Sequence, residues 1–130
     1  FDPAVNPYAV RVVITGSRPD PSAFGEFPHF ISFDGFIDVE YTPEQLERVA
    51  LISEPFCRYA KWKGGPEPLP AQEKQVIEQL IAKSHKAGKP IRFWCSPDNA
   101  VAWETFRKLG IDIINTGQPE ACTLYFQQNP

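Results

Sequence analysis

The sequence predicts an α/β fold built on parallel strands. Five short apolar runs are rich in β-branched and aromatic residues and show little alternation with polar residues, which is typical of strands covered on both faces. Helix-forming segments separate most of these runs, and such alternation indicates parallel strands joined by right-handed crossovers. The 130 residues suit one domain, 1–130, with one core. The predicted strands are 10–16, 30–34, 49–53, 91–96 and 111–116.

The first two helices are predicted from their ends and from an apolar stripe. Thr42 is a capping residue, with Pro43 at the first helical position and Gln45 placed to complete a capping box. The segment 71–86 carries an apolar stripe with charged and amide residues opposite it, and Gly88 ends the helix. The stripe consists of Val76, Ile77, Leu80 and Ile81.

Two further helices follow the fourth and fifth predicted strands. Asp98 or Asn99 caps the third helix, Trp103 belongs to its inner stripe, and Gly110 ends it. The last helix begins near Gln118. Proline fixes φ and donates no backbone hydrogen bond, so the proline clusters are predicted to be loops. These clusters are 1–7, 19–28 and 64–70.

The alternation of strands and helices leaves two architectures open. One is an open, doubly wound sheet, and the other is part of a closed barrel. A full barrel of this kind needs eight strands and typically about 250 residues. Five strands are too few to close one.

Composition and charge exclude several classes of partner. The formal net charge is −3 and the pI is about 5.4, so the surface has no electrostatic footprint for nucleic acid or for an anionic membrane. No apolar run approaches the roughly 20 residues of a transmembrane segment. Cys57, Cys95 and Cys122 fit no metal-ligand spacing, and we expect them to be small buried hydrophobic residues. One disulfide is the alternative if the protein is exported.

Polar residues gather at the carboxyl ends of the predicted strands. Ligands collect at these ends in both architectures. The strand interiors are apolar, apart from Ser32 in mid-strand and Arg11, Arg92 and Asp112 near the amino-terminal ends. This asymmetry predicts a site at the carboxyl ends. The candidate substrate-binding residues are Arg18, Asp34, Ser53, Trp94 and Asn115.

Each of the best candidates also has a structural interpretation. Trp94 can form a wall against the carbon skeleton of a ligand, or it can simply fill the core. Arg18 can hold a phosphate through a forked pair of hydrogen bonds, or it can be a solvated loop residue. Asp34 can accept a hydrogen bond from a substrate hydroxyl or help to bind a cation, or it can shape a turn with Gly35.

The sequence offers no catalytic set. His85 lies late in a predicted helix, where a positive charge is favourable, and His29 precedes a strand. There is no Ser-His-Asp arrangement, no cluster with metal-ligand spacing and no glycine-rich phosphate loop. We therefore expect no catalytic residue and no metal site within this chain.

Several motifs, in order, resemble the superfamily of phosphatidylinositol-specific phospholipase C-like and glycerophosphodiester phosphodiesterases. The stretch 88–99, Trp103 and the stretch 109–116 resemble the last two βα units of that superfamily. Upstream, the similar segments are 13–19, 33–35, 51–53 and 59–62.

This resemblance implies strands four to eight of a (β/α)₈ TIM-type barrel. It implies a phosphoric diester hydrolase that acts on a glycerophosphodiester or phospholipid-type substrate by general acid–base catalysis. The catalytic His pair, and any Ca²⁺ or Mg²⁺, would then belong to the missing N-terminal half. Trp94 would be the aromatic wall and Arg18 a phosphate-binding residue, whereas Asn115 stands where relatives often have Asp.

The resemblance also bears on partners and compartment. A half-barrel would pair with its N-terminal half or with a second copy of this chain. A start at Phe1, without an initiator Met, fits a mature product or a fragment. The resemblance favours export. The competing hypothesis is a small, non-enzymatic, flavodoxin-like binding module.

Overall fold

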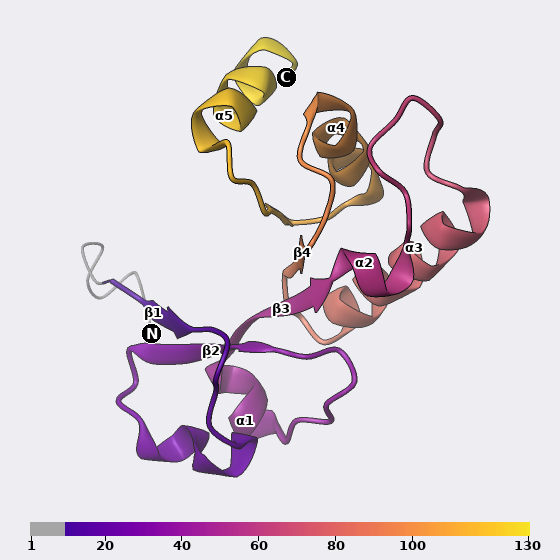
Figure 1. Cartoon of the computed structure of the whole chain (residues 1–130). Coiled ribbons are helices and arrows are strands. Elements are labelled where there is room, and N and C mark those ends of the chain that lie inside the picture. Colours follow the sequence, from indigo (N-terminus) through magenta and orange to yellow (C-terminus); the bar gives the residue numbers. More distant parts are fainter. Residues whose placement is uncertain (1–9) are drawn as a thin grey trace.

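The computed structural model describes residues 10–130 and contains one sheet of five strands. All neighbouring strands are parallel, and their order in the sheet is their order in the chain (Figure 1). The α/β fold and the parallel strands are therefore confirmed, while the predicted loop 1–7 lies outside the described residues. The strands are β1 (Val12–Ile14), β2 (Ile31–Gly35), β3 (Val49–Pro55), β4 (Ile91–Trp94) and β5 (Ile113–Ile114).

Helical segments connect the strands and follow the last one. In Figure 1 these helices lie outside the curl of the sheet. The connections include one 3₁₀ helix, η1 (Pro21–Glu26), within the segment 19–28 that was predicted to be a loop. The α-helices are α1 (Pro43–Arg48), α2 (Phe56–Tyr59), α3 (Ala71–Lys86), α4 (Ala100–Leu109) and α5 (Pro119–Gln128).

The order of the strands distinguishes between the two architectures. A flavodoxin-like sheet has the order 2-1-3-4-5 and helices on both faces. Here the order runs from β1 to β5 without a reversal, and the sheet curls as half of a barrel. β1 and β5 are its two edges, each paired on one side only within the described residues.

The sheet has one apolar face and one polar face. Phe33, Ile52 and Phe93 are at most 3% exposed and form the core together with apolar side chains of α3 and α4, such as Ile77 and Phe106. Successive side chains of a strand point to opposite faces. The alternate residues therefore face the concave side, which the helices leave uncovered. These residues include Ser32, Asp34, Ser53, Arg92 and Trp94.

The helices begin and end close to the residues predicted from their capping residues and apolar stripes. Thr42 and Gln45 form the full capping box of α1. α3 spans the predicted residues 71–86. Asn99, and not Asp98, caps α4 by accepting a hydrogen bond from the backbone N–H of Ala102. The predicted strands 10–16 and 111–116 are shorter in the structure, because only their central residues pair with a neighbouring strand.

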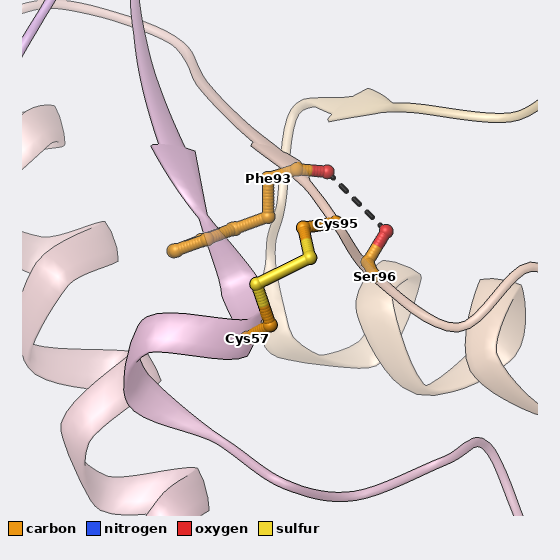
Figure 2. The surroundings of a disulfide bond; sticks show 4 residues. All are labelled: Cys57, Phe93, Cys95 and Ser96. Carbon is orange, nitrogen blue, oxygen red and sulfur yellow. Dashed lines mark hydrogen bonds between the residues drawn. A yellow bond between two sulfur atoms is a disulfide. The ribbon is translucent and has the colours of Figure 1, made fainter.

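The cysteine prediction was wrong for two residues of three. Cys57 and Cys95 form a disulfide with their Cα atoms 5.6 Å apart (Figure 2). Cys122 is buried and free. The disulfide depends on how the strands pair in the folded sheet, not on the spacing of the cysteines in the sequence. β3 pairs with β4 so that Pro55 lies opposite Trp94. Cys95 follows Trp94 directly, and Cys57 comes two residues after Pro55, so the two cysteines lie close together. The two cysteines are 38 positions apart, and that spacing alone does not reveal the contact.

No helix among residues 10–130 is both long enough and apolar enough to cross a membrane.

The two faces of β4 give a first prediction. Phe93→Ala should lower the free energy of unfolding by about 3–5 kcal/mol, because it leaves a cavity in the core. Trp94→Ala, one residue later on the concave face, should cost about 1 kcal/mol or less. Urea unfolding followed by far-UV circular dichroism measures both. Equal losses would contradict the assignment of the faces.

Candidate functional site

A cavity of about 350 Å³ lies at the carboxyl ends of the first four strands. It opens on the concave side of the sheet, where the alternation of side chains places polar groups rather than core residues. Each strand from β1 to β4 contributes lining residues, either from the strand itself or from the loop that follows it. Its lining residues are Thr15, Gly16, Arg18, Asp34, Phe36, Ser53, Arg92 and Trp94.

Asp34 is the charged centre of this cavity. It is 4% exposed and lies near the end of β2. Its Oδ1 accepts a hydrogen bond from Nη1 of Arg18, and its Oδ2 lies 3.6 Å from Nη2 of Arg92. The register of β2 against β3 shifts between Phe33 and Asp34, where β3 has one extra residue, Ala50.

Arg18 is held on two sides. Besides the ion pair with Asp34, its guanidinium carbon lies 3.7 Å from the centre of the Phe36 ring. The loop that carries Arg18 turns at Gly16, which has a φ of 77° that favours glycine. Stacking and ion pairing together give the planar guanidinium a defined orientation in the cavity wall, where the side chain is 10% exposed.

Arg92 approaches the same carboxylate from the other side of the cavity. Its Nη2 and Nε donate to the hydroxyl oxygen of Ser53, at 2.8 Å and 3.2 Å. Ser53 and Arg92 are register partners on β3 and β4, so the sheet itself fixes this contact. The Arg92 side chain stays 26% exposed and can still reach a ligand.

The lining residues carry an excess of positive charge. Two guanidinium groups face one carboxylate, which leaves about one positive charge among the residues that line the cavity. Arginine suits carboxylate and phosphate groups because its fork can donate two parallel hydrogen bonds. Trp94, 45% exposed, adds an apolar wall beside these charges. The arrangement can therefore bind a small anion that carries a carbon skeleton.

The structure brings together four of the five predicted substrate-binding residues. Arg18, Asp34, Ser53 and Trp94 line one cavity, and their role in binding stays a prediction. Asn115, just beyond β5, is exposed and does not line it.

Four lining residues were not among the predicted candidates: Thr15, Gly16, Phe36 and Arg92. Arg92 was placed near the amino-terminal end of its strand, but its long side chain reaches the carboxyl end. Its spacing of two from Trp94 was the available signal, because residues i and i+2 share a face. Phe36 follows β2 directly and had no comparable signal.

Glu54 lies behind the cavity and supports it. This glutamate is 1% exposed and was not singled out from the sequence. Its two oxygens accept hydrogen bonds from the backbone N–H of Ile37, at 2.8 Å, and from the hydroxyl of Tyr59, at 2.9 Å. Burial raises the pKa of Tyr59, and the hydrogen bond to Glu54 raises it further. Glu54 thus fixes the chain next to Phe36, on which Arg18 stacks.

Asp98 fixes the loop that follows β5. Its carboxylate accepts hydrogen bonds from Nε1 of Trp103, at 2.8 Å, and from the backbone N–H of Gly117, at 2.9 Å. Burial raises the pKa of this carboxyl, but hydrogen bonds from Thr116, Gly117 and Trp103 outweigh burial, so the pKa lies below its ordinary value of 3.8. Asp98 therefore connects this loop to α4 instead of capping the helix.

Both histidines lie outside the cavity. Nε2 of His85 is 2.8 Å from Oδ2 of Asp112, which also accepts a hydrogen bond from the backbone N–H of Ile91. This contact lies at the amino-terminal end of β4, and His29 precedes β2. Over residues 10–130, no group of three or more His, Cys, Asp or Glu residues is placed to hold a metal ion.

Comparisons with protein-family models, with curated proteins and with solved structures gave no match for this chain.

The hydrogen bonds to Asp98 predict a pH dependence. Because the folded state lowers the pKa of this carboxyl, its contribution to stability is complete above the ordinary pKa and is lost as the pH falls through the folded value. Asp98→Asn should therefore flatten the fall of the free energy of unfolding below about pH 4. Urea titrations at several pH values test this. An equally steep acid loss in wild type and variant would contradict it.

Proposed function

We propose that this chain forms part of a phosphoric diester hydrolase of the phosphodiesterase barrel type, corresponding to strands four to eight. In this proposal it supplies one wall of the pocket and the side chains that hold the phosphate of a glycerophosphodiester or phospholipid-type substrate. The observation that carries the proposal is the convergence of Arg18 and Arg92 on Asp34, beside an exposed Trp94, at the carboxyl end of a half-barrel.

The charge of the cavity suits a diester. A phosphodiester carries a single negative charge at neutral pH, which matches the excess of about one positive charge among the lining residues. Arg18 and Arg92 would donate to its non-bridging oxygens. Asp34 would accept a hydrogen bond from a hydroxyl of the alcohol group, and Trp94 would pack against the carbon atoms.

Proton transfer would come from outside this chain. Hydrolysis by general acid–base catalysis needs groups that can give and take a proton within hydrogen-bond reach of the substrate. Neither histidine lines the cavity. In the family that the sequence resembles, two His perform this step with the help of acidic residues and often Ca²⁺ or Mg²⁺. We assign all of these to the other half of the barrel.

The open sheet supports a partner for this chain. β1 and β5 each leave one side unpaired within the described residues, and exposed strand edges favour pairing with further strands. We propose the N-terminal half of the same barrel as that partner, with a second copy of the chain as the alternative. The Cys57–Cys95 disulfide supports export, because disulfides persist in oxidising compartments.

Binding of a soluble diester tests the proposal directly. Glycerophosphocholine, followed by isothermal titration calorimetry, should bind the chain more tightly than glycerol does. Arg92→Gln should weaken that binding by roughly tenfold to a hundredfold, because a charge-assisted hydrogen bond contributes about 1.5–3 kcal/mol. Arg107→Gln is the matched control, since Arg107 pairs with Glu104 on the outer surface. No binding, or an equal loss in both variants, would refute the assignment.

The missing proton-transfer groups predict that binding occurs without turnover. The chain alone should release no choline or glycerol 3-phosphate from glycerophosphocholine, because none of the lining residues is a histidine.

Light scattering after size exclusion should show a dimer if a second copy covers the edges. A stable monomer that binds the diester would favour the binding-module hypothesis, and hydrolysis by this chain would show that the catalytic groups lie within it.

A further inference from the structure

A disulfide immediately follows Trp94 in the chain, since Cys95 is one of its two cysteines. Cys57 is the second residue of α2, just beyond β3, and Cys95 follows β4 (Figure 2). The bond therefore joins the carboxyl ends of two neighbouring strands that contribute Ser53, Arg92 and Trp94 to the cavity. We infer that its specific role is to position Trp94, by holding Cys95 in a left-handed backbone conformation.

The backbone of Cys95 is the first support for this inference. Its φ is 54°, the only positive value at a non-glycine residue among residues 10–130. An L-residue adopts this region at a cost and stays there only when its surroundings enforce it. On one side, β4 is fixed by pairing up to Trp94. On the other side, a hydrogen bond of 3.4 Å joins Oγ of Ser96 to the carbonyl of Phe93.

The disulfide is the strongest of these local constraints. The Ser96 hydrogen bond is long, and Cys95 is exposed, so packing around the residue is limited. The bond to Cys57 is covalent, and α2 is itself anchored by Phe56, which is 1% exposed. A rigid point on α2 is thus connected to the strained residue that follows Trp94.

Trp94 depends on its backbone for its position. Its side chain is 45% exposed, and it takes part in none of the aromatic pairs formed by residues 10–130. The other two tryptophans are different, since Trp62 and Trp103 are 8% and 4% exposed and each donates an indole hydrogen bond. A change in the turn at Cys95 would therefore move Trp94 and leave the other two in place.

Replacement of both cysteines separates positioning from simple cross-linking. Cys57→Ser with Cys95→Ala removes the bond and leaves a residue that disfavours a positive φ. Cys57→Ser with Cys95→Gly also removes the bond, but glycine adopts a positive φ readily. Both variants lack the cross-link, so both should have a lower melting temperature than the wild type. Cys122, the one cysteine that remains in both variants, is buried and has no second cysteine to pair with.

Acrylamide quenching of tryptophan fluorescence reports on Trp94, because it is the exposed tryptophan of the three. The Trp94→Phe variant identifies its share of the signal. We expect the alanine variant to change the quenching constant of Trp94 by roughly twofold, and the glycine variant to return to the wild-type value. Wild-type quenching in the alanine variant, or the same altered quenching in both, would overturn the inference and leave the disulfide with a role in stability alone.

The consequence for ligand binding rests on the proposed function. Affinity for glycerophosphocholine should fall by roughly fivefold to tenfold in the alanine variant and recover in the glycine variant, in parallel with quenching. The positioning role of the disulfide and the proposed function of the cavity can be refuted independently of each other. Loss of the quenching pattern overturns the positioning role, whereas an Arg92→Gln variant that binds as tightly as the wild type overturns the assignment of the cavity. Recovered quenching without recovered affinity would show that Trp94 is no part of the binding wall.

Discussion

The register of the parallel strands is the constraint on which both the core and the cavity depend. All five strands run in one direction, so their carboxyl ends meet at one edge, and side chains alternate between the two faces. Phe93 is thereby buried under the helices while Arg92 and Trp94, on either side of it, face the concave surface. A slip of one residue would exchange these roles. The packing energy of Phe93 therefore also fixes the positions of the polar residues.

Within the cavity, the two arginines and the carboxylate offset the free-energy cost of burying one another's charges. A carboxylate that is 4% exposed is costly unless it is paired, and Asp34 has a guanidinium at each oxygen. In return, Asp34 holds two like charges within one small cavity, where Arg18 and Arg92 would otherwise repel each other. Phe36 and Ser53 then restrict the orientation of each guanidinium. The cavity is in this way preorganised, which lowers the ordering cost of binding an anion.

How far the sequence predicts this structure depends on whether a signal is local. The capping residues of α1 and the stripe and end of α3 act within a few residues of each other, and the sequence predicted them correctly. The carboxyl-end rule also gave four residues of the cavity, because parallel strands place their ends together. The Cys57–Cys95 bond depends on the pairing of β3 with β4, and the contact of Arg92 with Asp34 joins residues of β4 and β2 across β3. Neither feature has a local signature.

Under the proposed function, the half-barrel would separate two tasks that an enzyme must combine. All the contacts that orient Arg18 and Arg92, through Asp34, Phe36 and Ser53, are made within residues 10–130 and need no second half. The orientation of both guanidinium groups is thus built into this sheet, whether or not a partner covers the concave face. Proton transfer is different under the proposed function, because no histidine lines the cavity and a partner would bring the group to a substrate that is already oriented. If the proposed function holds, one half of the barrel therefore fixes the phosphate, and the chemistry depends on how accurately the other half closes over it.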